Sequence, residues 1–257
     1  MRLFDSHNHL QDKRLFFELE NVMGRAKKAG VERIAVKGCC EADWEKVVEI
    51  VNRYPNAFFA FGLHPWFVHG RSTQWFQHLE ELLTTYPQAT VGEIGIDHAV
   101  ENRDDSLQEE LFLQQLDLAC KLERCVTIHC RKAWGRLIEL LDQFPNLPPL
   151  LIHCFGGSAE VASELLKRGA YLSFSGSITR PNSTKAKAAI LAVPNDRILI
   201  ETDAPDLLPN PLQNIPNEPA FLPLVLERAA ALRGCSKEEL AELTFQNATR
   251  FFTGRAS

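Results

Sequence analysis

Apolar and polar residues alternate along this chain with two different periods. Short apolar runs, bounded by turn-forming residues, are separated by longer segments in which apolar residues recur every three or four positions. The short runs predict buried strands, and the longer segments predict amphipathic helices. Strands are expected near residues 2–5, 31–37, 57–62, 90–94, 125–129, 150–153, 171–175 and 198–201.

The predicted helices fill the intervals between these strands and follow the last one. They are expected at residues 16–29, 43–54, 74–86, 106–124, 133–144, 159–167, 184–192, 220–232 and 237–249. Gly30 and Gly169 follow periodic segments, where a left-handed C-cap is common. The proline-rich stretch 205–219 predicts a long loop and not a domain boundary, because a helical pattern resumes directly after it.

Eight strand–helix units without a break in composition predict a parallel sheet closed into a single (β/α)8 barrel of the TIM type. The length of 257 residues suits either such a barrel or two small domains, and without a linker the single domain 1–257 is favoured. In this α/β fold the active site lies at the carboxyl ends of the strands. Residues that follow the predicted strands are therefore the first candidates for chemistry.

The net charge restricts the range of functions more than the composition does. Apolar residues make up 45% of the chain and charged residues 24%, which is ordinary for a globular protein. The formal net charge of −5 gives no global attraction to nucleic acid. Any polyanionic substrate would have to be held by a local basic patch or by metal ions.

Cysteine usage and the lack of long apolar runs bear on the compartment. The seven cysteines are an odd number and none forms a CxxC pair, which argues against a disulfide framework and a structural zinc knuckle. The N-terminal sequence has no apolar core of signal-peptide length, and no run reaches the roughly 18 residues of a membrane span. We expect a cytoplasmic protein in a reducing compartment, without membrane association.

Side chains that bind metal ions gather at the predicted strand ends. Glu93, for example, ends an apolar run between Gly92 and Gly95, where a carboxylate has no evident packing role. A structural explanation would scatter such residues along the strands, whereas these gather at the end where barrel enzymes carry out chemistry. The candidates are His7, His9, Glu93, His129, His153 and Asp203.

The first cluster, DSHNH at 5–9, has a spacing that suits a metal site. In an extended chain alternate side chains share a face, so His7 and His9 can meet one cation, with Asp5 behind them to orient the rings. Imidazole nitrogens bind zinc and similar ions well. An isolated HxH is also compatible with a solvated surface turn, and the later candidates favour the metal site.

Six motifs in a fixed order resemble the series found in the TatD family of metal-dependent hydrolases. The motifs are FDSHNHL at 4–10, GLHP at 62–65, GEIGID at 92–97, IHCRKA at 128–133, IHCFGG at 152–157 and ETDAP at 201–205. NEPA at 217–220 and Asn247 extend the resemblance to nearly the full chain. The resemblance implies a TIM-like barrel of the amidohydrolase superfamily, two divalent metal ions and hydrolysis, often of phosphodiester bonds by a 3′ to 5′ exonuclease.

Carried over to this chain, the resemblance implies particular ligands. One metal ion, zinc, magnesium or manganese, would be held by His7, His9 and Asp203, and a second by His129 and His153, each at the matching motif position. The carboxylate of the GEIGID motif would bridge the two.

Asp203 and Glu93 are then the predicted catalytic residues, with Asp203 as both ligand and general base. Glu201 is expected either behind the ligands as a partner that orients them or in a structural salt bridge. The resemblance also suggests that His64 contacts a substrate phosphate, and Arg131 and Arg180 near the mouth could do the same.

Several further residues near the predicted mouth allow two interpretations. Trp66 and Phe67 could stack on a base or sugar, but packing within the loop is slightly favoured. Cys130 and Cys154 follow proposed ligands, and strand alternation should turn both toward the helix layer as packing residues. The loop 98–105 is acidic, which disfavours extended duplex and favours a short or single-stranded end.

Three functions remain open from the sequence. The leading one is a metal-dependent hydrolase of a nucleic acid end or a small phosphodiester. The second is an amidohydrolase or esterase, including deacylation of D-aminoacyl-tRNA. The third, a barrel that binds metal or nucleotide without turnover, is disfavoured because Asp203 and every proposed ligand are present. No feature points to an obligate protein partner.

Overall fold

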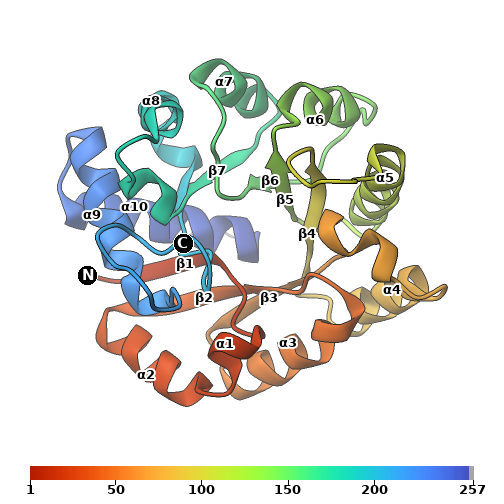
Figure 1. Cartoon of the computed structure of the whole chain (residues 1–257), viewed down its shortest axis with the longest axis horizontal. Helices are drawn as coiled ribbons and strands as arrows, with labels where there is room; N and C mark the ends of the chain where they lie inside the picture. The colour runs from red at the N-terminus through yellow and green to blue at the C-terminus, as the bar shows by residue number, and fades with distance from the viewer. Residues whose placement is uncertain (255–257) are drawn as a thin grey trace.

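A computed structural model describes residues 1–254. Eight parallel strands pair in chain order, and helices lie outside them, as seen in Figure 1. The predicted TIM-like (β/α)8 barrel is confirmed. The strands are β1 (Leu3–Asn8), β2 (Val31–Lys37), β3 (Ala57–Phe61), β4 (Thr90–Asp97), β5 (Val126–Arg131), β6 (Leu150–Ile152), β7 (Tyr171–Phe174) and β8 (Ile198–Ile200).

The helices alternate with the strands, and two of them follow β8. They are α1 (Lys13–Phe16), α2 (Leu19–Lys28), α3 (Glu41–Arg53), α4 (Trp75–Thr85), α5 (Asp105–Lys121), α6 (Trp134–Leu141), α7 (Ala159–Lys167), α8 (Thr184–Ala192), α9 (Leu222–Arg233) and α10 (Lys237–Thr253). Short 3-10 turns are η1 (Pro65–Gly70), η2 (Gly176–Thr179), η3 (Asn195–Arg197) and η4 (Pro219–Phe221). The proline-rich stretch after β8 is mainly a loop, as predicted.

Several element boundaries differ from the prediction; β1, for example, ends at Asn8, three residues beyond the predicted end at 5. The helix expected at 16–29 is α2 at Leu19–Lys28, and the short helix α1 precedes it, capped by the Asp12 side chain, which accepts the N–H of Arg14. The chain then turns before α2. Strand β4 runs three residues beyond the predicted end at 94, since Gly95 lets it lie against β5. A Cβ at Gly95 would overlap the carbonyl oxygen of His129.

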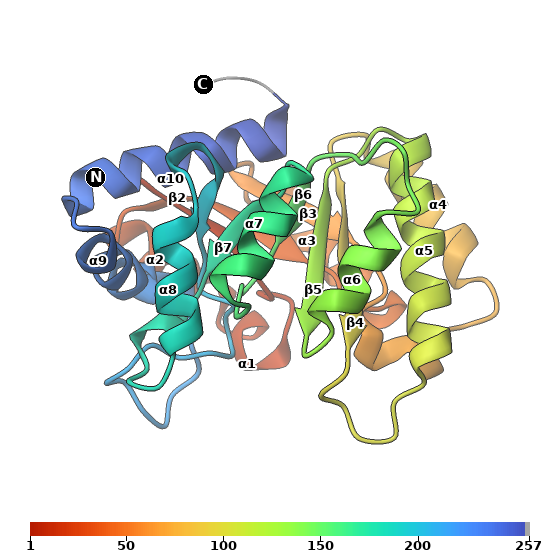
Figure 2. The same cartoon turned by 90° about the horizontal axis from the view of Figure 1, so that it is seen from above.

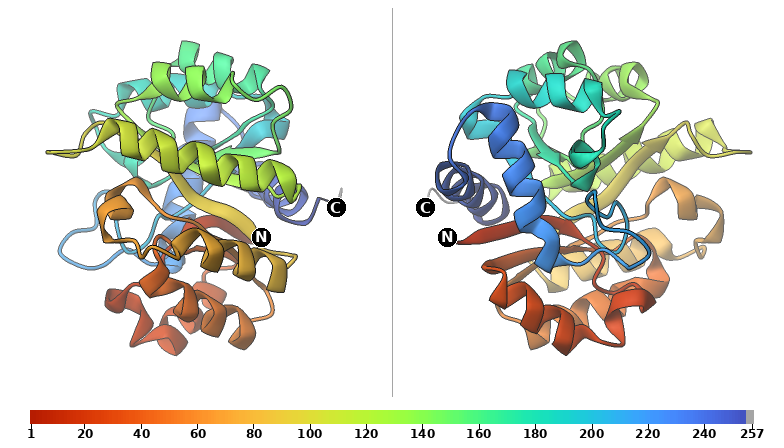
Figure 3. Two further views of the ribbon diagram at one scale, coloured as in Figure 1. Left: turned by 90° about the vertical axis from the view of Figure 1, so that its right-hand side faces the viewer. Right: turned by 60° about the vertical axis from the view of Figure 1, so that its left-hand side comes forward.

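The two ends of the barrel are closed differently. Figure 2 shows α10 across one end and the loops after β4 and β8 projecting from the other, and Figure 3 shows the same two loops on one side and the C-terminus on the opposite side. At the α10 end an aromatic cluster fills the interior: the Phe4 ring lies 5.2 Å from Phe58 and 5.3 Å from Phe252. The other end, formed by the carboxyl termini of the strands, is therefore the one available for a functional site.

Strands β1 and β8 meet through side chains of the DSH motif. The Asp5 carboxylate accepts the backbone N–H (2.8 Å) and the hydroxyl of Thr202. The Ser6 hydroxyl donates to the carbonyl of Ile200 (2.9 Å), and the N–H of Asp203 donates to the carbonyl of His7 (3.0 Å). The expectation that Asp5 orients the His7 and His9 rings is therefore wrong; Asp5 holds the chain after β8 against β1.

The aromatic plug predicts a large stability loss from truncation of one ring. Phe252 is 6% exposed, so Phe252→Ala should lower the free energy of unfolding by about 3–5 kcal/mol through lost burial and a residual cavity. Urea denaturation measures this change. Phe17→Ala is the matched control, because Phe17 is 85% exposed and its loss should change stability by less than about 0.5 kcal/mol. Equal stability of the two variants would show that α10 does not seal the barrel.

Candidate metal centre

Four of the other predicted ligands surround the buried carboxylate of Glu93. Its Oε2 lies 3.2 Å from His7 Nε2 and 3.5 Å from His9 Nε2. Its Oε1 lies 3.1 Å from His129 Nδ1 and 2.7 Å from His153 Nε2. Oε2 thus faces His7 and His9, and Oε1 faces His129 and His153, with His64 Nε2 also 3.3 Å away. Two groups of imidazoles around one carboxylate suit two adjacent sites that share a ligand.

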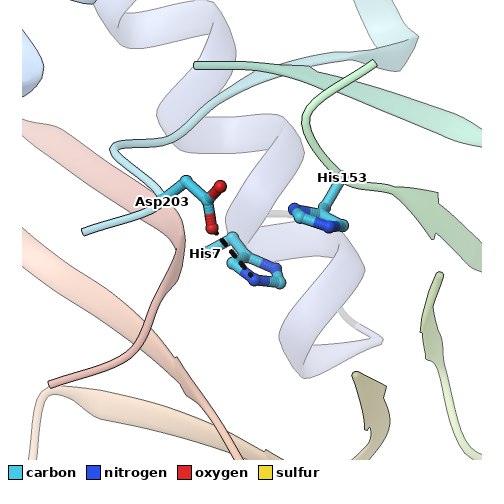
Figure 4. A group of neighbouring side chains, drawn as sticks. All are labelled: His7, His153 and Asp203. Carbon is cyan, nitrogen blue, oxygen red and sulfur yellow. Dashed lines mark ion pairs between the residues drawn. The ribbon is translucent and has the colours of Figure 1, made fainter. Parts of the chain in front are cut away.

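Asp203 completes the first of these groups. Its Oδ1 lies 3.6 Å from His7 Nε2 and 3.5 Å from His9 Nε2. Figure 4 shows the Asp203 carboxylate directed toward His7, with the ring of His153 beside them. The backbone of Asp203 has φ 57°, in the left-handed region that aspartate tolerates better than most residues. Its side chain is 13% exposed, so this carboxylate is open to solvent at the mouth.

Groups behind the ligands set which ring nitrogen faces the centre. His9 Nδ1 lies 3.0 Å from the carbonyl of Lys37, and His129 Nε2 lies 3.0 Å from Asp97 Oδ2. Both partners are acceptors, so these nitrogens carry the ring protons and leave lone pairs on His9 Nε2 and His129 Nδ1. Each lone pair then faces Glu93.

Glu201 lies behind His153. Glu201 Oε1 accepts the N–H of Cys154 at 2.6 Å and lies 3.4 Å from His153 Nδ1, in ion-pair range but without hydrogen-bond geometry. The carboxylate is fully buried. Of the two interpretations that the sequence left open, its position favours an orienting partner of His153.

The charges in this cluster shift the pKa values of its carboxylates. Burial raises the pKa of Glu93, but interactions with the neighbouring imidazoles of His153, His64 and His7 outweigh this effect and hold that pKa well below its usual value. Burial also raises the pKa of Asp97, but hydrogen bonds from His129 and from the N–H of Ala99 outweigh this effect and bring that pKa down to about 2. Both side chains are therefore anionic at neutral pH.

This donor set fits divalent cations. His7 Nε2 and His9 Nε2 are 3.2 Å apart, and His129 Nδ1 and His153 Nε2 are 3.1 Å apart. In a neutral His129 ring the Nδ1 lone pair would point at an anionic oxygen 3.1 Å away, which is unfavourable unless a proton or a metal cation lies between the two atoms. Imidazoles combined with carboxylates are the ligands preferred by zinc and related ions.

His64 lies within the same cluster. Its Nδ1 accepts the backbone N–H of Trp66 (3.1 Å), and its Nε2 lies 3.3 Å from Glu93 Oε1. Burial lowers the pKa of His64 to about 4, so the ring is neutral at pH 7 with its proton on Nε2. The role predicted for it, contact with substrate, stays a prediction, with Nε2 as the available atom.

The predicted basic contacts lie on the surface. Arg131 and Arg180 are exposed, and within residues 1–254 neither pairs with a carboxylate. The acidic loop that follows β4 is partly neutralised. Asp104 caps α5 by accepting the N–H of Leu107 (3.0 Å), and Asp105 pairs with Arg103 at 2.6 Å. The repulsion of a polyanion expected from this loop is therefore weaker than its composition predicts.

The two cysteines that follow ligands differ from each other. Cys130 is buried in the apolar core, as predicted. Cys154 is not a packing residue of the helix layer, because β6 ends at Ile152 and strand alternation no longer applies to it. Its thiol lies 3.1 Å from the hydroxyl of Ser175.

Asp97 is the main contact that the sequence analysis missed. It is fully buried, binds His129, and accepts the indole N–H of Trp66 at 2.8 Å. A signal was present, since Asp97 lies four residues after Glu93 and so shares its face if the strand continues. The prediction ended the strand at 94 and lost that alternation.

A TIM barrel with candidate metal ligands gathered at the carboxyl ends of its strands is typical of the class of metal-dependent hydrolases. The chain matches the family described as TatD related DNase over residues 4–253, and it belongs to that family. Within residues 1–254, none of the helices combines the length and apolar composition of a membrane span.

Individual relatives agree with this membership. The chain is 36% identical to the metal-dependent hydrolase YabD of Bacillus subtilis, over 97% of this chain and 98% of that protein. It is 33% identical to the 3′-5′ ssDNA/RNA exonuclease TatD of Cronobacter sakazakii, over 99% of each. The crystal structure of YjjV, a TatD homologue from Escherichia coli, superposes with a TM-score of 0.93 at 29% identity and covers 98% of both chains.

The shared position of Glu93 predicts that its loss affects both metal sites. In Glu93→Ala the affinity for both ions should fall more than about 100-fold, the upper range for groups that merely orient a ligand. In His153→Ala one site should be affected. Metal content by mass spectrometry after dialysis measures both results. Glu101→Ala, which removes an exposed glutamate, is the control and should keep the wild-type content. Unchanged stoichiometry in Glu93→Ala would rule out a shared ligand.

Proposed function

We propose that this protein is a two-metal hydrolase that cleaves phosphodiester bonds at the 3′ end of single-stranded DNA or RNA. The observation that carries the proposal is that the two oxygens of Glu93 face different groups of imidazoles at the mouth of the barrel. Oε2 faces His7 and His9, whereas Oε1 faces His129 and His153, with His64 beside them. Relatives of similar length that are named 3′-5′ ssDNA/RNA exonucleases support the substrate class.

In this proposal His7, His9 and Asp203 would hold one ion, His129 and His153 would hold a second, and Glu93 would be a ligand shared by both. Four imidazoles favour zinc, and the carboxylates also allow manganese or magnesium. Bound ions of this kind supply Lewis acidity and lower the pKa of a water molecule.

The side chains of the site have separate roles in this proposal. Asp203 is the more solvent-accessible of the two central carboxylates, with its side chain 13% exposed against 3% for Glu93. It is positioned to take a proton from the attacking water and return it to the leaving oxygen. Glu93, enclosed by imidazoles, holds the ligands in place. His64 Nε2 can donate to a phosphate oxygen, and Arg131 and Arg180 can meet the adjoining phosphates.

The other expectations about setting and substrate fit this proposal. All seven cysteines are free, which supports a reducing compartment such as the cytoplasm. A substrate end needs few basic contacts because metal ions carry much of the attraction for phosphate, in keeping with the net charge of −5. The partners proposed are therefore nucleic acid ends or small phosphodiesters.

An activity screen on metal-loaded protein tests the proposal. The substrates are single-stranded DNA, single-stranded RNA, a small phosphodiester and D-aminoacyl-tRNA, each with zinc, manganese and magnesium. Release of mononucleotides from the 3′ end supports the proposal. Turnover of D-aminoacyl-tRNA without cleavage of either oligonucleotide would replace it with the deacylase alternative.

Asp203→Asn separates the two roles proposed for this residue. Asparagine keeps the size and one coordinating oxygen but is not a base, so kcat should fall by about 10² to 10⁴ while substrate binding largely survives. The measurements are kcat, KM, metal content and melting temperature. A purely structural Asp203 would instead lower the melting temperature and leave kcat of the folded protein near normal. Near-normal kcat in metal-loaded Asp203→Asn would end the proposed mechanism.

The small number of basic contacts predicts a weak salt dependence. Lys132, the exposed neighbour of Arg131, is a third candidate cation. If Arg131, Lys132 and Arg180 all meet phosphate, log Kd against log salt should have a slope no steeper than about 2, at about 0.7 per contact on single strands. Fluorescence anisotropy with Asp203→Asn at several salt concentrations measures it. Arg131→Ala should reduce the slope by about 0.7. A steeper slope would reveal a basic track outside these residues.

A further inference from the structure

One large aromatic side chain lies exposed at the edge of the metal centre. Of the four tryptophans, Trp66 is the exposed one, at 55%, whereas Trp44 and Trp75 are buried and Trp134 packs against the core. The neighbouring Phe67 is 40% exposed. Both lie in η1, directly after His64. Apolar rings left in water beside a catalytic site indicate a contact made by the substrate.

The Trp66 ring is held in place although it is exposed. Its indole N–H donates to Asp97 Oδ2 at 2.8 Å, and its backbone N–H donates to His64 Nδ1 at 3.1 Å. Asp97 is itself held by the side chain of Gln108, which accepts its N–H at 2.8 Å, and by the N–H of Ala99 at 2.7 Å. A ring tied to a buried strand residue loses little further freedom on binding, which favours affinity.

The position of the ring relates it to the reacting centre. The Trp66 ring centroid is 5.0 Å from that of His64 and 6.2 Å from that of His129, and His64 Nε2 is 3.3 Å from Glu93. In space, the His64 ring therefore lies between the Trp66 ring and Glu93, one of the proposed metal ligands. A group attached to a phosphate bound there would meet the indole face.

We propose that Trp66, extended by Phe67, is the stacking platform for the nucleobase next to the scissile phosphate. This inference rests on the proposed function and adds the part of the substrate that is recognised. Every base offers an aromatic face, so the platform is indifferent to sequence. A base within a duplex has both faces covered by its neighbours and would have to be unstacked first, which selects unpaired ends.

The alternative for Trp66 is a structural role through Asp97, which also binds His129. That role predicts an equal loss on every substrate, because the metal centre itself would be disturbed. A stacking role predicts a loss that depends on the base. The two can be separated by removing the ring and the base independently, since interacting groups give non-additive effects.

The first experiment is a kinetic cycle. Wild type, Trp66→Ala and Trp66→Phe are compared on a single-stranded oligonucleotide and on two versions with an abasic residue at the terminal or the penultimate position. On the intact oligonucleotide, kcat/KM should fall about tenfold in Trp66→Ala, and much less in Trp66→Phe, which keeps a ring. On the abasic version that lacks the base stacked on Trp66, the loss of kcat/KM caused by Trp66→Ala should largely disappear. Leu191→Ala, an exposed apolar residue on α8, is the control for surface truncation.

The second experiment measures binding without turnover. In the Asp203→Asn background the tryptophan fluorescence should be quenched by an oligothymidylate, and the added change Trp66→Phe should abolish the quenching while base stacking persists. Quenching without cleavage of any nucleic acid by wild type would retain the platform and overturn the proposed hydrolysis. If the wild type cleaves nucleic acid but shows no quenching, and if removal of the Trp66 ring and removal of the base have additive effects on kcat/KM, the stacking platform is ruled out while the proposed hydrolysis stands. Melting temperatures verify that each variant is folded.

Discussion

The structure depends on one buried carboxylate. Glu93 is 2% exposed, and a charge removed from water is strongly unfavourable unless it is paired. Five imidazoles lie within ion-pair distance of its two oxygens, and they come from four other parts of the barrel. These imidazoles, and the cations that they would hold, surround the charge only when β1, β5, β6 and the turn after β3 are all in register. The same requirement that assembles the site constrains the fold around it.

Glycines make this assembly possible. Gly95 lets β4 approach β5, and a Cβ at Gly62 would come within 2.8 Å of the backbone at Gly92. Strand β4 therefore lies closer to its neighbours than side chains would allow, and Glu93 reaches the axis of the barrel. At the opposite end the interior is filled by aromatic rings from α10, and Lys37 extends its ammonium to within 4.4 Å of the Phe252 ring centroid. The aromatic packing and the candidate metal centre thus lie at opposite ends of the barrel.

The outer contacts of the centre connect it to the surface where substrate arrives. Asp97 binds His129 on one side and the Trp66 indole on the other. A single buried carboxylate therefore sets both the ring orientation of a proposed ligand and the position of an exposed aromatic face. In the proposed reaction Trp66 would hold the base, and the centre that includes His129 would hold the phosphate. Because Asp97 links these two residues by hydrogen bonds, the nucleotide would be aligned with the proposed general base Asp203.

The sequence by itself determined the barrel and the set of candidate ligands. Apolar runs and amphipathic segments are local patterns, and the rule that parallel strands present their carboxyl ends together places His7, Glu93 and His153 at one mouth. Those inferences need no knowledge of which atoms touch. They were sufficient to predict eight strands and to single out the residues that the structure brings around Glu93.

Only the tertiary structure decided how those residues act on one another. Asp5 binds Thr202, which lies 197 positions away, and the continuation of β4 to Asp97 depends on contact with β5. Cys154 lies where a strand has ended and its alternation no longer applies. The exposed position of Trp66 follows from a hydrogen bond to that same extended strand. Each of these depends on register between segments distant in the chain, which is set by packing and not by any local pattern.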